Sequence, residues 1–267
     1  MMSRTEVRQW QRRPVVSNPE LIDSFNHRFA VITADTLALQ EQAYRLRYQV
    51  YCIENSFENL RDHPMELEMD EFDAHSVHTV IIDRSSQAVT GTVRLILPEP
   101  DAFEKSFPIQ RVCNHPLLRK DRFLHTARPA EVSRFAVSKK FSRRTAECQP
   151  SSQRRTDARN ERQTTMPNIT LGLINGTVRM SVEHGVTEWF AVMEPSLLRL
   201  LAKYGIYFSP IGPMVNYHGM RQPCYVIFEK MLGRVRKERI DVWEFITENG
   251  RLLDRGDLPF ASFRLNN

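Results

Sequence analysis

The sequence predicts one main domain of α/β (α+β) class, with a mixed central sheet flanked by helices. Segments with strand-like and helix-like hydrophobic patterns alternate along the 267 residues, as expected when helices cover both faces of a sheet. Apolar residues make up 41% of the chain and charged residues 26%, values typical of a globular domain. No apolar run reaches the roughly 18–20 residues that a membrane span requires.

The expected elements begin and end at recognisable signals. Asp35 and Asn168 stand where a side chain can cap a helix, and Gly185 and Gly205 stand where a helix can stop. In chain order the elements are strand 29–33, helix 37–51, strands 77–83, 89–97 and 131–138, helix 169–184, strand 187–193, helix 196–204, a proline-interrupted strand from about 207, and strand 224–230. The short segment 84–88 indicates a hairpin.

The domain organisation is expected to be simple. Residues 1–28 show little periodicity and are expected to form an N-terminal arm. The main domain is expected over 29–233, and 234–267 is expected to form a C-terminal extension. No internal repeat is present.

The positive charge is concentrated in residues 139–166. This segment holds eight Lys or Arg and three Asp or Glu, which accounts for the formal net charge of +5 of the whole chain. It contains no Leu, Ile or Val, so we expect a flexible basic insertion within the domain. It is either a solvated loop or a docking arm for an acidic partner, and nucleic acid, an anionic membrane and an acidic carrier protein are all compatible with its charge.

Several kinds of site are not supported. The four cysteines form no CxxC pair, so we expect neither a zinc site nor a disulfide framework. No GxGxxG or GxxxxGKS motif occurs, which argues against a Rossmann nucleotide site and a P-loop. The basic N-terminus lacks the apolar core of a signal peptide, and the expected location is the cytoplasm.

Charged residues occur within or next to predicted strands and helices, at positions that are expected to be buried. Each has a simple explanation: the acidic segment 70–73 (DEFD) as a solvated turn, Arg94 as a residue at a strand end that reaches water, and Arg47 as a surface partner of Glu41 or Glu54. Together, three carboxylates and three arginines would balance one another if they converge. Such a set would hold a carboxylate in place as a general base. The candidates are Arg47, Glu68, Asp70, Asp73, Arg94, Glu131, Ser133 and Arg134.

The strand 131–138 raises a question of direction. Side chains alternate along a strand, so Glu131, Ser133 and Phe135 are expected on one face. Arg134 is then expected on the other face, or at an edge where the strand separates from its neighbour.

The order and spacing of these residues resemble the acyl-homoserine-lactone (autoinducer) synthases and the N-acyl amino acid synthases. The matching positions over 45–137 are Arg47, Tyr51, Phe57, Asp70, Asp73, Arg94 and the EVSRF segment 131–135. The sequence departs from the lactone synthases at Tyr51, where they carry Phe, and at Phe57, where they carry Trp. Residues 188–223, with an ME-P helix start and a YHG-x-R-x-P motif, are similar to the acyltransferases associated with PEP-CTERM/exosortase systems.

The resemblance implies a GNAT-like fold and an acyltransferase. It implies transfer of a long-chain fatty acyl group from a thioester to a small amine or amino acid. Glu131 is the expected general base, with Asp70 assisting or binding the amine and Ser133 hydrogen-bonding the intermediate. The supporting charges are Arg47, Asp73, Arg94 and Arg134, and the expected substrate contacts are Tyr51, Phe57, Phe135, Tyr217, His218 and Arg221. His218 is a second candidate base.

The sequence also bears on the acyl donor and on the alternative functions. The glycine-rich pyrophosphate loop of acetyl-CoA-using relatives is absent after residue 137, and the basic segment stands in its place. This favours an acyl carrier protein, carrying a phosphopantetheine thioester, over coenzyme A, with no permanently bound cofactor. An acyl-homoserine-lactone synthase is the alternative enzyme. A non-catalytic protein that binds RNA or DNA is disfavoured, because residues 139–166 offer only Phe141 for base stacking.

Overall fold

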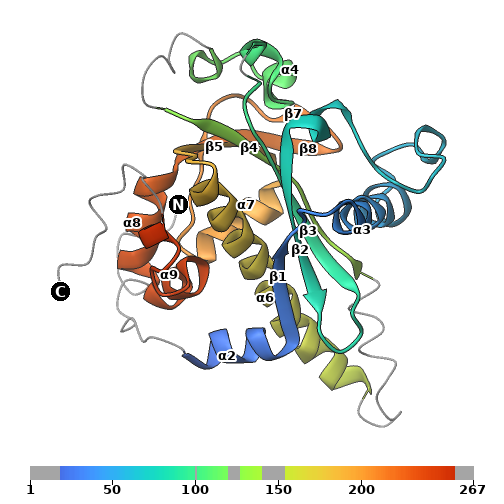
Figure 1. Ribbon diagram of the computed structural model, residues 1–267, viewed down its shortest axis with the longest axis vertical. Helices are drawn as coiled ribbons and strands as arrows, with labels where there is room; N and C mark the ends of the chain where they lie inside the picture. Colours follow the sequence, from blue (N-terminus) through green and yellow to red (C-terminus); the bar gives the residue numbers. More distant parts are fainter. Residues whose placement is uncertain (1–18, 100, 120–126, 140–153, 256–267) are drawn as a thin grey trace, which may run out of the picture.

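The protein is built around one mixed sheet (Figure 1). The computed structural model describes residues 19–99, 101–119, 127–139 and 154–255. Within these ranges the sheet runs β1-β2-β3-β4-β5-β8-β6, with β7 paired to β8, and β4 and β5 are parallel. The strands are β1 (Phe29–Thr33), β2 (Ser76–Asp83), β3 (Val89–Ile96), β4 (Pro129–Val137), β5 (Glu188–Met193), β6 (Ser209–Pro210), β7 (Val215–Asn216) and β8 (Met220–Ile227).

Helices cover both faces of the sheet. The α-helices are α2 (Pro19–Arg28), α3 (Leu37–Tyr48), α4 (Ile109–Val112), α6 (Arg154–Glu183), α7 (Pro195–Lys203), α8 (Phe228–Glu238) and α9 (Ile240–Thr247). Figure 1 shows α3 on one side of β2 and β3, and α6, α8 and α9 on the other. The larger core lies on the α6 side and includes Ile81, Val93, Trp189 and Ile246. None of the described helices combines the length and the hydropathy needed to cross a membrane.

Most predicted elements are confirmed, and the exceptions have physical causes. Thr36, rather than Asp35, caps α3, because its hydroxyl accepts the Leu39 amide. The last predicted strand ends at Ile227, and residues 228–230 begin α8. Apolar residues at helical spacing, Phe228, Met231, Leu232 and Val235, are buried along this helix.

The basic segment is more ordered than predicted. Helix α6 begins at Arg154, so the expectation of a flexible loop is wrong for 154–166, and Asn168 lies inside the helix instead of capping it. Arg, Gln, Glu and Ala favour helices, and adding turns to an existing helix costs less than starting a new one. Residues 140–153 of this segment lie outside the described residues.

Parts of the expected arm and extension also belong to the main core. Phe25 of α2 is buried against Phe245 of α9, with ring centroids 4.9 Å apart. The proposed limits of the three segments remain predictions.

Helix α6 approaches β2 closely at Gly176. A Cβ atom at this position would lie 2.3 Å from Cγ2 of Thr79. We expect Gly176→Ala to lower the free energy of unfolding by about 1–3 kcal/mol, because overpacking outweighs the better helix propensity of alanine. Urea denaturation measures this. The control Glu183→Ala, at an exposed position of the same helix, should stay within about 0.5 kcal/mol; an unchanged Gly176→Ala would mean that α6 can move away from β2.

The sheet opens between β4 and β5. Their pairing runs from Pro129 and Glu188 to Glu131 and Phe190. Strand β5 continues to Met193 along β8, whereas β4 continues to Val137 along β3. The two strands therefore separate beyond Glu131, and Glu131 and Ser133 lie at this opening.

Candidate active site

A bulge in β4 determines where its side chains point. Arg94 pairs with Ser133 and Thr92 pairs with Ala136, so two residues of β4 oppose Val93 alone. Arg134 has φ +48°, a backbone conformation that bulges use to insert a residue. Of the two places expected for Arg134, the face opposite Ser133 is wrong, because both side chains contact one charge cluster. Arg134 lies where β4 has separated from β5, which agrees with the other expectation.

The same bulge changes the position of Phe135. Because one residue is inserted, Phe135 and Val137 turn to the face that carries the larger core and pack against it. Phe135 is not among the residues lining the cavity described below. Phe135 is therefore not part of this cavity, and its predicted contact with substrate stays a prediction.

The acidic segment forms a short 3₁₀-helix, η3 (Glu71–His75), with a capping box at its start. The Asp70 carboxylate accepts the Phe72 amide at 2.9 Å, and the Asp73 carboxylate accepts the Asp70 amide at 2.8 Å. The spacing of the two aspartates is the spacing that a capping box requires. It aims both carboxylates at the arginines of neighbouring elements.

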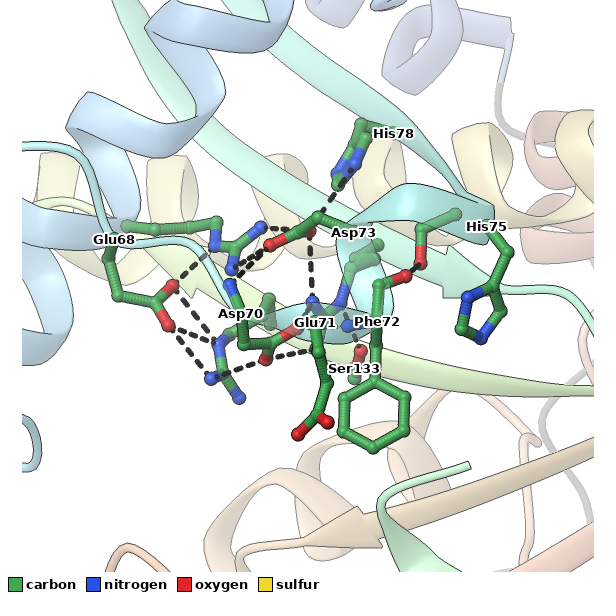
Figure 2. Close-up of polar contacts among 12 residues, drawn as sticks. Glu68, Asp70, Glu71, Phe72, Asp73, His75, His78 and Ser133 are labelled. Carbon is green, nitrogen blue, oxygen red and sulfur yellow. Dashed lines mark hydrogen bonds and ion pairs between the residues drawn. The ribbon is translucent and has the colours of Figure 1, made fainter. Parts of the chain in front are cut away.

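Three carboxylates and three arginines form one buried cluster (Figure 2). Glu68 accepts hydrogen bonds from Arg47 and Arg134. Asp73 accepts from Arg47 at 2.7 Å and from Arg94 at 2.9 Å. Asp70 accepts from Arg94 at 2.6 Å and from Arg134 at 3.0 Å. Each carboxylate is shared by two arginines, so the formal charges balance.

The cluster is internal. Arg47 and Arg94 are 0% exposed and Glu68 is 1% exposed. A surface pair of Arg47 with Glu41 or Glu54 is therefore ruled out, and Glu41 pairs with Arg45 instead. The interpretation of 70–73 as a solvated turn is wrong for Asp73, whose side chain is 4% exposed, although Glu71 in the same segment is exposed to solvent.

The arginines keep the three carboxylates ionised. Burial by itself would raise the pKa of Glu68, but Arg47 and Arg134 outweigh it and lower that pKa to about 2. Burial opposes ionisation of Asp70 and Asp73 too, and their arginine partners hold both pKa values below the ordinary range. These groups are fixed anions at neutral pH, so a proton acceptor must come from elsewhere in the site.

Glu131 has the opposite environment. It is 2% exposed, and burial raises its pKa to about 7 despite the hydrogen bond from the Ile109 amide and the more distant Arg94 and Arg134. The amide donates to the carboxylate at 2.9 Å. A carboxyl group with a pKa near 7 can both accept and release a proton at neutral pH.

Glu131 lines a small polar cavity of about 30 Å³ at the opening between β4 and β5. The lining residues are Tyr51, Pro108, Glu131, Val132, Ser133, Arg134, Val192, Tyr217, His218 and Arg221. Phe57 lies next to two of these residues. Its ring centroid is 6.3 Å from that of Tyr51, and the guanidinium carbon of Arg221 lies over its ring, 5.5 Å from the centroid. Four predicted residues from distant parts of the chain therefore meet Glu131, Ser133 and Arg134 in this cavity: Tyr51, Tyr217, His218 and Arg221.

Tyr217 and His218 reach the cavity from the tip of a hairpin. Strand β7 pairs with β8 through Val215 and Arg221, and His218 has φ +51° at the turn. Its Nδ1 lies 3.4 Å from Oε1 of Glu58. Burial, more than any other cause, lowers the pKa of His218. The hairpin therefore places a neutral imidazole opposite β4.

The sequence pointed to some of these groups only in part. Glu68 is visible as a third acid in 66–73, but its place between two arginines is not. His78 was missed: it is buried on β2 with Nε2 3.6 Å from Asp73, and neither ring nitrogen has a hydrogen-bond partner among the described residues. No group of three or more His, Cys, Asp or Glu side chains in the described ranges is arranged to hold a metal ion.

Comparison with known proteins agrees with this architecture. Residues 46–149 match the family model of the acetyltransferase (GNAT) domain, a stretch that carries all three arginines and all three carboxylates of the cluster. The fold is GNAT-like. The expected fold class is confirmed, and the expected enzyme class, an acyltransferase, is confirmed by this domain. The family match covers about two fifths of the chain. A search of curated proteins found none that matches the chain.

Solved structures align with the chain at low sequence identity. TofI in a ternary complex with an inhibitor and MTA aligns with a TM-score of 0.51 at 17% identity, over 81% of this chain and 96% of that one. FeeM, an N-acyl amino acid synthase from uncultured soil microbes, aligns at 0.49 and 12% identity, over 78% and 94%. BjaI, a CoA-dependent acyl-homoserine lactone synthase, aligns at 0.49 and 20%, over 83% and 99%.

Proposed function

We propose that this GNAT domain is an N-acyltransferase that moves a fatty acyl group from a thioester to a small amine or amino acid, with Glu131 as the general base. The observation that carries the proposal is a carboxyl group with a pKa of about 7 in a cavity where β4 and β5 separate. This is the point at which the sheet exposes backbone groups to a ligand.

The protons of the reaction define what the site must do. An ammonium ion cannot attack a carbonyl, so Glu131 first removes one proton from it, directly or through a water molecule. The free amine then adds to the thioester carbon, the carbon–sulfur bond breaks, and the thiolate leaves. The nitrogen loses a second proton as the amide forms. One of the two protons ends on the thiol and the other leaves with solvent.

Ser133 and the β4 backbone are suited to stabilise the intermediate. The Ser133 hydroxyl oxygen accepts Nε of Arg94 at 2.9 Å, which leaves its O–H to donate to an oxyanion or to the thiolate. Backbone N–H groups of β4 beyond Glu131, up to Phe135–Val137, are candidate oxyanion donors because β5 has diverged there. The charge cluster holds Ser133 and Arg134 in place, so this geometry exists before substrate binds.

The proposal also covers the acyl donor and the residues that contact the acceptor amine. We take the donor to be an acyl carrier protein, which the basic residues 139–166 attract through opposite charge. The acceptor contacts the hairpin residues Tyr217, His218 and Arg221, with Tyr51 and Phe57 behind them. The resemblance to PEP-CTERM-associated acyltransferases supports an acyltransferase other than a lactone synthase.

A thiol-release assay tests the function. Long-chain acyl carrier protein, or the matching acyl-CoA, is incubated with the full chain and a panel of amines and amino acids. We expect amine-dependent release of free thiol, faster with the carrier protein at low salt and slowed as salt screens the docking charges. No release with any amine would contradict the enzyme assignment. Equal rates with acyl-CoA would overturn only the assignment of an acyl carrier protein as the donor. A lactone product would identify the alternative enzyme, an acyl-homoserine-lactone synthase.

A further inference from the structure

The Glu131 carboxylate is held by a segment made of three short helices. These are η4 (Phe103–Lys105), α4 (Ile109–Val112) and η5 (Pro116–Leu118). The hydrogen bond to Glu131 comes from Ile109, the first residue of α4. A helix of one turn is not stable alone, so other contacts must fix the direction of this amide.

Gln110 makes contacts that fix it. Its carboxamide oxygen accepts the Phe107 amide at 2.9 Å. Its carboxamide nitrogen donates to the carbonyl oxygens of Phe103, at 3.0 Å, and Leu118, at 3.1 Å. One side chain therefore ties α4 to the helices before and after it.

Apolar packing alone would not set this orientation. Phe103, Phe107, Ile109 and Leu118 pack in a second core cluster with Phe190 and Tyr225. Such contacts are attractive but not directional, whereas a hydrogen bond weakens steeply as its angle changes. Backbone hydrogen bonds from Arg111 to Pro108 and from Cys113 to Ile109 shape the turn itself. The three side-chain hydrogen bonds of Gln110 add directional contacts that join this turn to the helices on either side.

We propose that Gln110 is a positioning residue for the reaction: it fixes the Ile109 amide, which in turn orients the Glu131 carboxylate toward the cavity. Gln110 does not line the cavity and acts through Glu131. The inference rests on the proposed role of Glu131 as the base.

A double-mutant cycle tests this proposal. Gln110→Met keeps the size of the side chain and removes all three hydrogen bonds. In the wild-type background we expect kcat for thiol release to fall about tenfold or more, the effect of losing one hydrogen bond to a charged group, with KM nearly unchanged. In the Glu131→Gln background the same change should alter the remaining rate by less than about twofold, because contacts acting through one group are not additive.

The control for this experiment is a substitution at the neighbouring residue of α4. Arg111→Gln changes the next residue of α4, whose exposed side chain pairs with Glu71, and should leave kcat unchanged. If Gln110→Met does not fold, Gln110→Glu keeps an acceptor for the Phe107 amide and allows the same cycle. An unchanged kcat, or an equal loss in both Glu131 backgrounds, overturns the positioning role. A wild-type rate in Glu131→Gln alone overturns the base, which is a separate result.

Discussion

Glu131→Gln is expected to lower kcat for amine-dependent thiol release by about 10²–10⁴-fold, the usual contribution of a general base. Glutamine has nearly the same shape and can still accept the Ile109 amide, but it cannot take a proton from the ammonium group of the substrate. The thiol-release assay at pH 7.5 measures this. Wild-type activity in Glu131→Gln would remove Glu131 from the mechanism.

The same substitution is expected to stabilise the protein at high pH. The pKa of Glu131 is raised from 4.5 to about 7 in the folded state, so the folded protein keeps a proton that the unfolded chain has lost. Stability from this group is therefore full below pH 4.5 and is lost as the pH rises to about 7, at a cost of about 3 kcal/mol. Glu131→Gln should raise the urea midpoint more at pH 8 than at pH 5. An equal effect at both pH values would contradict the raised pKa.

Glu68→Gln is expected to cost about 3–5 kcal/mol of unfolding free energy, because it leaves a buried, uncompensated positive charge. Glu68 is 1% exposed and accepts hydrogen bonds from both Arg47 and Arg134. Urea denaturation at pH 7 measures the loss. We also expect thiol release to slow, because Arg134, which lines the cavity next to Ser133, would lose its charged hydrogen-bond partner Glu68.

The matched control is Glu41→Gln on α3. Glu41 pairs with Arg45 at 2.7 Å, but both side chains are about half exposed, and such surface pairs contribute roughly 0–1 kcal/mol. A loss below about 1 kcal/mol in Glu68→Gln, similar to that control, would show that the buried cluster reorganises or admits water.

The sequence was informative where local spacing determines structure. Two aspartates three residues apart form the capping box of η3, and the alternating strands 76–83 and 89–96 pair as expected. The convergence of the three arginines with these carboxylates was also expected, because unpaired charges do not persist in a core.

The remaining features depend on contacts that no local pattern encodes. A single inserted residue at Arg134 reverses the direction of Phe135, and nothing in the EVSRF segment distinguishes it from a regular strand. The contact between Ile109 and Glu131 joins a one-turn helix to a strand 22 residues away, and residues 98–130 show no period that predicts it. The start of α6 at Arg154 was missed because its first turns carry no apolar stripe.

The most direct test of the central claim is the pH dependence of kcat/KM for thiol release in the wild type and in Glu131→Gln. For the wild type we predict a rate that rises with pH through an apparent pKa of about 7, the value set by burial of Glu131. The residual kcat/KM of Glu131→Gln should not rise through a pKa near 7, and its pH dependence should reflect only the ionisation of the substrate amine. The same rise in both proteins, or no rise near pH 7 in the wild type, would contradict a mechanism in which Glu131 is the base.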